Sequence, residues 1–353
     1  AAAAESIRLH PESPRYFLFR AKPTILLTSA EHYGAVLNRD FRYERYLATL
    51  QAAGFNYTRI FTGAYREVPG NFRIASNTLA PAPGRFIAPW VQDGDQWDLA
   101  RWNEAYFVRL RDFVGQASRR GIVVEVTLFC PYYEDSMWQV SPLYTPGVPR
   151  TEALTRTHPR LVAVQEAMVR RIVGELREFD NVFYEIANEP YFGGVTLDWQ
   201  AHIARVIQDT DPTHLIAQNI ANGSKKIDDP NPLVSLFNFH YARPPETVAV
   251  NWGLNKAIGC DETGFDGVAD APYRIQGWDF LVAGGALYNN LDYSFTVGHE
   301  DGSFVYPDTQ PGGGGATLQR QLRILRDFFA GLDFVRMAPD ASVVQGEAPA
   351  GAS

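Results

Sequence analysis

Short runs of apolar and β-branched residues alternate along the chain with longer segments of helical periodicity. The runs predict strands at residues 24–28, 56–61, 122–129, 181–187, 215–220, 233–240, 257–261 and 286–291. The periodic segments predict helices at residues 41–53, 102–120, 158–179, 197–210, 245–252, 273–283 and 318–332. Strands that alternate with helices indicate a parallel sheet. Eight of them favour a closed (β/α)8 TIM barrel, which takes about 250 residues, over an open doubly wound sheet.

Local signals support this alternation. Gly54 and Gly121 follow two of the predicted helices, where a glycine commonly ends a helix. The third predicted strand, residues 122–129, is an almost continuous apolar run. Such a run is typical of a parallel strand that is buried on both faces.

Two long segments rich in Gly, Pro and aromatic residues follow the second and third strands, at residues 62–99 and 131–157. Loops of this length are commonly functional, so we predict a barrel with elaborated loops after strands 2 and 3. Residues 1–335 are predicted to form one catalytic barrel. Residues 336–353 are predicted to form a C-terminal tail, which is either a frayed end or the start of a truncated accessory β domain.

Charge and composition narrow the classes of partner. The formal net charge of −8 and the scattered arginines argue against a nucleic-acid-binding face. No apolar run approaches the ~20 residues that span a bilayer, so no membrane partner is expected. The two cysteines, Cys130 and Cys260, each end a predicted buried strand and argue against a disulfide framework. The chain starts Ala1-Ala2-Ala3-Ala4-Glu5 without a secretory signal pattern. We expect a secreted or periplasmic protein whose signal precedes this numbering, with a cytoplasmic location as the alternative.

Polar residues gather where the predicted strands end. In a parallel barrel the carboxyl ends of the strands meet at one face, and reactive groups lie there. The residues in question are Arg59 on strand 2, Glu134 just beyond strand 3, Asn188 and Glu189 after strand 4, His240 and Tyr241 at strand 6, and Glu262 at strand 7.

Two of these residues, Glu189 and Glu262, fit one reaction. Glycoside hydrolysis needs one carboxylic acid beside the leaving oxygen and one carboxylate on the other side of the anomeric carbon, about 5–5.5 Å apart when configuration is retained. Strands 4 and 7 lie on opposite sides of an eight-stranded barrel, so their tips can converge. Asp261 and Glu300 are rivals of Glu262, and strand parity decides between Asp261 and Glu262.

Other residues have supporting roles in this interpretation. Arg59 would keep Glu262 ionised, unless it pairs with a core carboxylate such as Glu125 or Glu185. Asn188 would bind the sugar 2-hydroxyl, and Tyr241 would donate to Glu262. Additional candidates for sugar contacts are His32, after strand 1, and Tyr288, on strand 8. Four further aromatics would either bind sugar rings or pack within loops: Trp90, Tyr133, Trp138 and Trp252.

Three segments resemble glycoside hydrolase clan A, and family 5 cellulases in particular. Residues 182–190 (Val-Phe-Tyr-Glu-Ile-Ala-Asn-Glu-Pro) look like the fourth-strand signature, residues 56–60 like the second-strand segment and residues 259–264 like the seventh-strand segment. The resemblance covers roughly residues 24–332, on the strand count of the barrel. It implies that Glu189 is the acid/base and Glu262 the nucleophile, that Arg59 supports the nucleophile, and that His240 is the sixth-strand histidine.

The chain departs from that family at three strands. Phe129-Cys130-Pro131 stands where a third-strand histidine is usual, and His240 and Tyr241 are adjacent instead of separated by one residue. The eighth-strand tryptophan is missing, and Tyr288 and Phe295 are the nearest aromatics. We therefore predict a retaining glycosidase that cleaves β-linked oligo- or polysaccharides, with β-glucan or cellulose-like substrates favoured. The alternative is a carbohydrate-binding barrel with weakened catalysis.

Cofactors and metals are not expected. The seven histidines contain no pair at the i, i+4 spacing of zinc-binding helices. The chain also lacks a dinucleotide-binding Gly-x-Gly-x-x-Gly motif after the first strand and a phosphate-binding Lys-Ser/Thr after its glycine run.

Overall fold

The computed structural model describes residues 5–343 and residue 346. Its centre is one eight-stranded sheet in which the hydrogen-bonded neighbours run parallel, in the order β4-β13-β12-β11-β10-β9-β8-β5. The strands are β4 (Leu26–Ala30), β5 (Tyr57–Phe61), β8 (Val123–Phe129), β9 (Val182–Ala187), β10 (Ile216–Asn222), β11 (Leu236–His240), β12 (Ala257–Glu262) and β13 (Leu287–Leu291). These eight strands confirm the predicted (β/α)8 barrel.

The barrel closes between β4 and β5 through one asparagine. The Asn56 side chain accepts a 2.9 Å hydrogen bond from the Leu27 N–H and donates one of 2.9 Å to the Ile25 carbonyl. The Asn56 N–H also donates to the Leu27 carbonyl at 3.4 Å. An amide side chain thus supplies donor and acceptor at a seam where a strand ladder would otherwise be needed.

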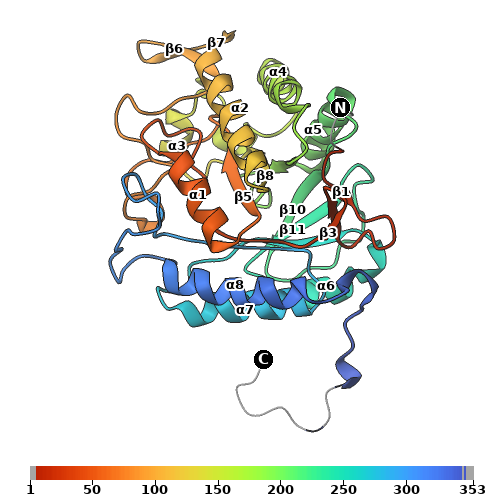
Figure 1. The fold of residues 1–353 in the computed structure, drawn as a ribbon. Coiled ribbons are helices and arrows are strands. Elements are labelled where there is room, and N and C mark those ends of the chain that lie inside the picture. Colours follow the sequence, from red (N-terminus) through yellow and green to blue (C-terminus); the bar gives the residue numbers. More distant parts are fainter. Residues whose placement is uncertain (1–4, 344–345, 347–353) are drawn as a thin grey trace.

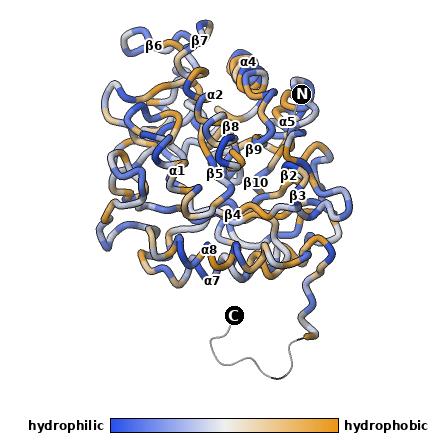
Figure 2. The backbone as a smooth tube through the Cα atoms, viewed as in Figure 1, coloured by the Kyte–Doolittle hydropathy of each residue, from blue (hydrophilic) through white to orange (hydrophobic). Residues whose placement is uncertain are grey.

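Helices surround the strands (Figure 1). They are α1 (Tyr43–Ala53), α2 (Glu104–Arg119), α4 (Pro159–Leu176), α5 (Leu197–Thr210), α6 (Glu246–Val250), α7 (Asp270–Val282) and α8 (Ala316–Ala330). In α8 the buried Leu318, Leu322, Leu325 and Phe329 recur every three or four residues, which places one apolar stripe against the barrel. Figure 2 shows the matching alternation of hydrophobic and hydrophilic colour along α8.

Gly54 ends α1 as expected. It adopts the left-handed conformation (φ 84°), and its N–H donates to the carbonyls of Gln51 and Leu50. A residue without a Cβ occupies this conformation at little cost. The chain then turns directly into Asn56 and β5, so the helix end also sets the position of the barrel seam.

The long segment after β5 is more ordered than a simple loop. It contains a short 3-10 turn (Asn71–Arg73) and an antiparallel hairpin, β6 (Trp90–Asp93) and β7 (Gln96–Trp102), which projects at the top of Figure 1. The hairpin takes in Trp102, so α2 begins at Glu104 and not at the predicted residue 102. The loop after β8 similarly contains α3 (Asp135–Val140).

An N-terminal three-stranded antiparallel sheet was not predicted. It consists of β1 (Arg8–Leu9), β2 (Phe17–Phe19) and β3 (Lys22–Thr24). Strands of two or three residues are too short to show a period in the sequence.

The predicted C-terminal tail, residues 336–353, falls partly on residues outside those that the structure describes. The described part of it includes a 3-10 turn at Ala341–Val343. Among the described residues, no helix is both long and apolar enough to cross a bilayer.

Candidate active site

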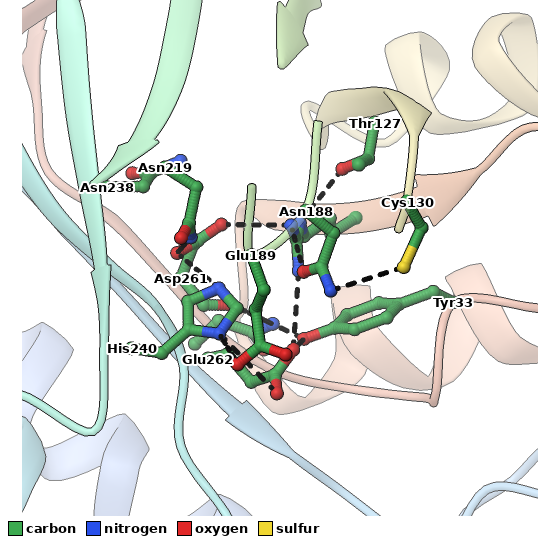
Figure 3. Close-up of polar contacts among 12 residues, drawn as sticks. Tyr33, Thr127, Cys130, Asn188, Glu189, Asn219, Asn238, His240, Asp261 and Glu262 are labelled. Carbon is green, nitrogen blue, oxygen red and sulfur yellow. Dashed lines mark hydrogen bonds and ion pairs between the residues drawn. The ribbon is translucent and has the colours of Figure 1, made fainter. Parts of the chain in front are cut away.

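The polar residues expected at strand ends lie at one end of the barrel. Arg59 is on β5, Glu189 follows β9, His240 ends β11 and Glu262 ends β12. They come together because all eight strands run in the same direction, so their carboxyl ends share one face. Figure 3 shows the carboxylates of Glu189 and Glu262 side by side, with the His240 ring on one side and the Tyr33 ring on the other.

The two glutamates are close enough to act on one bond. A carboxylate oxygen of Glu189, one of Glu262 and a ring nitrogen of His240 all lie within 4.8 Å of one another. This separation matches the short spacing of carboxylates in retaining glycosidases and is below the ~6.5–9.5 Å that inverting enzymes need for an intervening water. Strand parity also separates Glu262 from its rival, because Asp261 is fully buried next to Arg59 and does not line the pocket.

Hydrogen-bond donors surround the Glu262 carboxylate. Tyr33 donates to Oε2 at 3.0 Å, and the Tyr241 hydroxyl donates to Oε1. Arg59 Nη1 lies 3.5 Å from Oε2. The Tyr241 backbone N–H also donates to the Glu262 carbonyl at 3.0 Å. Donors of this kind fix the orientation of the carboxylate.

Glu189 lies on a strained turn directly after β9. Its φ of 34° is unusual for a residue with a side chain, and its carbonyl accepts a 3.0 Å bond from the Phe192 N–H. His240 Nδ1 lies 3.1 Å from Oε1, and the Tyr133 hydroxyl donates to Oε2. Burial alone would raise the pKa of Glu189, but the charge and hydrogen bond of His240 and the donor Tyr133 outweigh burial and lower that pKa.

Arg59 connects the catalytic face to the barrel interior. Its guanidinium is completely buried and forms ion pairs with Glu185, Asp261 (3.3 Å) and Glu262 (3.5 Å). It also donates to Asn188 Oδ1 at 2.9 Å and to Thr127 Oγ1 at 3.0 Å. The two interpretations of Arg59 are therefore compatible, since it contacts both a core carboxylate and Glu262.

Three buried carboxyl groups lie below the pocket. Burial and the neighbouring carboxylates raise the pKa of Glu125 well above its usual value, and burial raises the pKa of Glu185 to about 7. For Asp261, burial is outweighed by Arg59 and His240, which lower its pKa. These directions mean that Asp261 is the ionised partner of Arg59, whereas Glu125 holds a proton.

The glutamates open into a pocket of about 350 Å³. This volume lies near the lower end of the ~300–1,000 Å³ that small-molecule sites occupy. Most of its lining is aromatic or ionisable: His32, Tyr33, Phe61, Tyr65, Glu67, Phe72, Cys130, Tyr133, Asn188, Glu189, Phe192, Asn222, Tyr241, Glu262, Gly264, Phe265 and Asp266.

Most predicted site residues reach this pocket, but several of the aromatics do not, Trp90 and Trp252 among them. His32, Asn188 and Tyr241 line it, and His240 contacts both glutamates from behind. Trp138 instead packs on Tyr132 and donates from its indole to the Val148 carbonyl. Tyr288 is buried and donates to the Tyr273 carbonyl at 2.6 Å.

Tyr133, one of the candidate sugar-binding aromatics, does line the pocket, but several other pocket residues were missed in the sequence. Tyr33 was missed, although it directly follows His32 and lies just beyond the end of a predicted strand. That position is a usable signal, although tyrosine is common in loops. Asn222 ends β10 and so carries the same signal. Glu67 carries none, because nothing in the sequence shows that the loop after β5 folds back toward the barrel mouth.

Two groups of residues have spacings that would suit a metal ion: Glu189, His240 and Glu262, and the deeper Glu125, Glu185 and Asp261. In the first group tyrosine hydroxyls already donate to both carboxylates. In the second, the Arg59 guanidinium pairs with Glu185 and Asp261. A metal ion would have to compete with the tyrosine hydroxyls in the first group and would be repelled by the guanidinium in the second. The arrangement therefore fits acid–base chemistry better than metal binding.

No protein-family model matches the chain, and no curated protein matches its sequence. Solved structures do share its fold. A Bacteroides vulgatus protein named as a candidate glycoside hydrolase matches at TM-score 0.69 and 17% identity, over 93% of this chain and 62% of the other, so this chain spans less than two thirds of that protein.

Two enzymes from Rhizomucor miehei are similar over nearly their whole length. An endo-1,4-β-mannanase gives TM-score 0.67 and 12% identity over 93% of this chain and 100% of the other. A glycoside hydrolase family 5 mannosidase gives 0.62 and 14% over 95% and 99%. These likenesses confirm the barrel fold that the clan A resemblance implies.

Proposed function

We propose that this protein is a retaining glycoside hydrolase in which Glu189 is the acid/base and Glu262 the nucleophile. The observation that carries the proposal is the approach of the two carboxylates to within 4.8 Å at the carboxyl end of the barrel. Carboxylates this close can flank a single glycosidic bond. They leave no room for the water that inverting enzymes place on the opposite face of the sugar ring.

In the first step Glu262 attacks the anomeric carbon while Glu189 gives its proton to the departing glycosidic oxygen. The bond to the leaving group breaks, a covalent ester to Glu262 forms, and the alcohol is released. Donors from Tyr33 and Tyr241 orient the attacking carboxylate. In the second step Glu189 takes a proton from water, the hydroxyl oxygen attacks the same carbon, and Glu262 leaves as a carboxylate. Two inversions retain the configuration.

The proton for the first step is shared with His240. The pKa of Glu189 is lowered, against burial, by the charge and hydrogen bond of His240, so the proton resides on the imidazole. The 3.1 Å contact between Nδ1 and Oε1 is a direct path for its transfer. When the substrate excludes water from the pocket, burial of Glu189 increases and favours its neutral form.

The substrate is a β-linked sugar of few units. A pocket of about 350 Å³ holds a short saccharide and not an extended chain. At its mouth Phe192 and Phe265 are each 44% exposed, and such flat apolar faces can pack on sugar rings. The mannanase and mannosidase names of the structural neighbours favour a manno-configured sugar, whereas the sequence resemblance favours β-glucan, so both belong in the test.

The test is azide rescue of two alanine variants on aryl β-mannosides and aryl β-glucosides. Glu262→Ala should lose turnover by more than about 10⁴-fold, and azide should restore it with a glycosyl azide of inverted configuration. Glu189→Ala should keep the first step for a good leaving group, and azide should give the retained product. Sugar binding without turnover in the unmodified protein would instead establish the weakened, carbohydrate-binding alternative. If azide gave the retained product in Glu262→Ala and the inverted product in Glu189→Ala, Glu189 would be the nucleophile and Glu262 the acid/base.

A further inference from the structure

Glu67 is a buried carboxylate on the pocket wall, far in sequence from the catalytic pair. It comes from the loop after β5 and is 3% exposed. A buried carboxylate needs donors to offset its loss of hydration. Glu67 has three: Tyr65 donates to Oε1 at 3.2 Å, while the Asn77 amide and His32 Nε2 (3.2 Å) contact Oε2.

These contacts leave Glu67 with unused accepting capacity. An ionised carboxylate offers about four lone-pair sites, of which two on Oε2 and one on Oε1 are engaged. The remaining site is on Oε1, and Glu67 lines the pocket. If Glu67 served the fold alone, a fourth protein donor would stabilise the buried carboxylate further. The free lone pair on Oε1 is therefore available to a donor from a ligand.

His32 has a buried nitrogen, Nδ1, without a hydrogen-bond partner among the described residues. The residue is 9% exposed and lines the same pocket. The ring is fixed on its other side, because Nε2 contacts Glu67 and the ring stacks on Tyr33 with centroids 5.6 Å apart. An unpaired buried polar atom is destabilising, and a ligand hydroxyl in the pocket would remove that cost.

The wall that bears these two residues is rigid. The Glu31 carboxylate accepts from the N–H groups of Gly34 and Ala35 and from the Thr78 hydroxyl at 2.6 Å. This joins the loop after β4 to the loop after β5. The two loops touch so closely that a Cβ on Gly34 would lie 2.3 Å from the Thr78 carbonyl oxygen. His32 and Glu67 are therefore held in place before any ligand arrives, which favours tight and selective binding.

The position of this wall, the part of the pocket lining that carries His32 and Glu67, determines which part of a substrate it contacts. Tyr33, the neighbour of His32, donates to Glu262, so the wall adjoins the nucleophile. The leaving group departs on the side of Glu189, which protonates it. Glu189 follows β9, and two strands, β8 and β5, separate β9 from β4 in the barrel order. The wall thus faces the glycone, the sugar that becomes bonded to Glu262.

We propose that His32 and Glu67 form a clamp for two neighbouring hydroxyls of the glycone. One hydroxyl donates to Glu67 Oε1, and the adjacent hydroxyl bonds to His32 Nδ1. The clamp, which rests on the proposed glycosidase function, selects sugars by the presence of that hydroxyl pair and takes no part in bond cleavage. Vicinal hydroxyls have the spacing that two neighbouring polar groups on one wall can engage together.

Single-deoxy substrates test the clamp. The probes are para-nitrophenyl β-mannoside, β-glucoside and their 3-deoxy, 4-deoxy and 6-deoxy analogues. In the unmodified protein, removing either clamped hydroxyl should lower kcat/KM by about 10- to 100-fold, as for hydrogen bonds to charged groups. In Glu67→Gln and in His32→Gln the parent substrate should lose a similar factor, and removal of the corresponding hydroxyl should then cost less than about threefold.

His32→Gln is the more conservative variant, since its amide nitrogen can keep the contact to Glu67 while Nδ1 is lost. Glu152→Gln is the matched control. Glu152 contacts His158 Nε2 at 2.7 Å in the loop after β8 and does not line the pocket, so its deoxy penalties should equal those of the unmodified protein. Thermal melting of each variant checks that the loops still fold.

The results separate the clamp from the proposed function. If the unmodified protein hydrolyses the parent glycosides but both variants keep every deoxy penalty, the clamp is wrong and the glycosidase assignment stands. If no glycoside is hydrolysed and azide restores nothing in Glu262→Ala, the glycosidase assignment fails first. If Glu67→Gln fails to fold, unchanged deoxy penalties in folded His32→Gln still overturn the clamp.

Discussion

His240 Nδ1 lies 3.1 Å from Glu189 Oε1, and the ring is fully buried. Its other nitrogen, Nε2, lies 3.3 Å from Asp261 Oδ1. Burial alone would lower the pKa of His240, but the surrounding carboxylates outweigh it and hold that pKa well above its usual value. His240 and Glu189 thus share one proton, which resides on the imidazole.

The pH dependence of kcat/KM should report this shared proton. In the unmodified enzyme activity is lost at high pH when the pair gives up its proton, which happens above the ordinary histidine pKa of about 6.5. In His240→Asn the cation is gone, so burial raises the pKa of Glu189 against the Tyr133 and Asn222 donors only, and Glu189 alone must hold the proton. We expect the alkaline limb to move to lower pH and kcat to fall by about 10- to 100-fold.

The measurement is a kcat/KM profile over about pH 4–10, within the range where both proteins stay folded. His202→Asn is the control, because His202 contacts Glu166 at 2.6 Å outside the pocket. An alkaline limb that stays in place in His240→Asn would mean that His240 does not hold the catalytic proton.

Tyr241 should have its largest effect on the rate of the second step, in which Glu262 is the leaving group. Its hydroxyl donates to Glu262 Oε1, and a donor stabilises a carboxylate as it regains full charge. Tyr241→Phe should therefore slow release of the sugar from Glu262 by about 10- to 100-fold, the equivalent of a hydrogen bond to a charged group. Stopped-flow assays with an activated aryl glycoside should then show a burst of aryl alcohol followed by slow turnover.

The matched control is Tyr288→Phe, which removes a buried hydroxyl that contacts the Tyr273 carbonyl and the Thr263 hydroxyl and does not line the pocket. Its kcat should stay within about twofold, although it loses some stability. Equal kinetics of Tyr241→Phe and Tyr288→Phe would remove Tyr241 from the mechanism.

The barrel and its carboxylate pair were accessible from the sequence for a physical reason. Buried parallel strands are nearly continuous apolar runs and are recognisable without any partner information. In β8, only Glu125 and Thr127 interrupt the run among seven buried residues. Because parallel strands share one polarity, the residues that follow them must meet. Glu189 and Glu262 are 73 positions apart, yet strand direction alone brings them to one face.

The walls of the pocket could not be predicted in the same way. Loops have no periodicity, so nothing in the sequence places Glu67 against His32 or Thr78 against Glu31. Sequence position likewise shows that an aromatic is near a strand end but not which way its ring points. For that reason Trp138 and Tyr288 were candidates beside Tyr241, although both pack away from the pocket.

Removal of metal ions should leave activity unchanged. The lone pairs of Glu189 and Glu262 accept from tyrosine hydroxyls, and Arg59 lies 3.5 Å from Glu262. We expect dialysis against EDTA to change kcat/KM by less than about twofold, since none of the proposed steps needs a Lewis acid. A loss of activity that a divalent cation restores would assign the Glu189, His240 and Glu262 cluster to a metal instead.

Arg59 should be the most important cation for folding. It is completely buried between Glu185 and Asp261, and removing one partner from a buried ionic network costs about 3–5 kcal/mol. Arg59→Met should lose that much in urea unfolding. The control is Arg85→Met, because Arg85 pairs with Asp40 at the surface and such pairs contribute about 0–1 kcal/mol.

The loss in Arg59→Met should also depend on pH. Glu185, whose pKa burial already raises to about 7, would have a still higher pKa without the guanidinium. The folded variant then binds a proton more tightly than the unfolded chain, so the variant gains stability as pH falls and loses it as pH rises through the folded pKa. The difference between Arg59→Met and the unmodified protein should therefore be larger at about pH 8 than at about pH 5. A difference that is constant across this range would mean that the buried carboxyl groups do not depend on Arg59 for their charge.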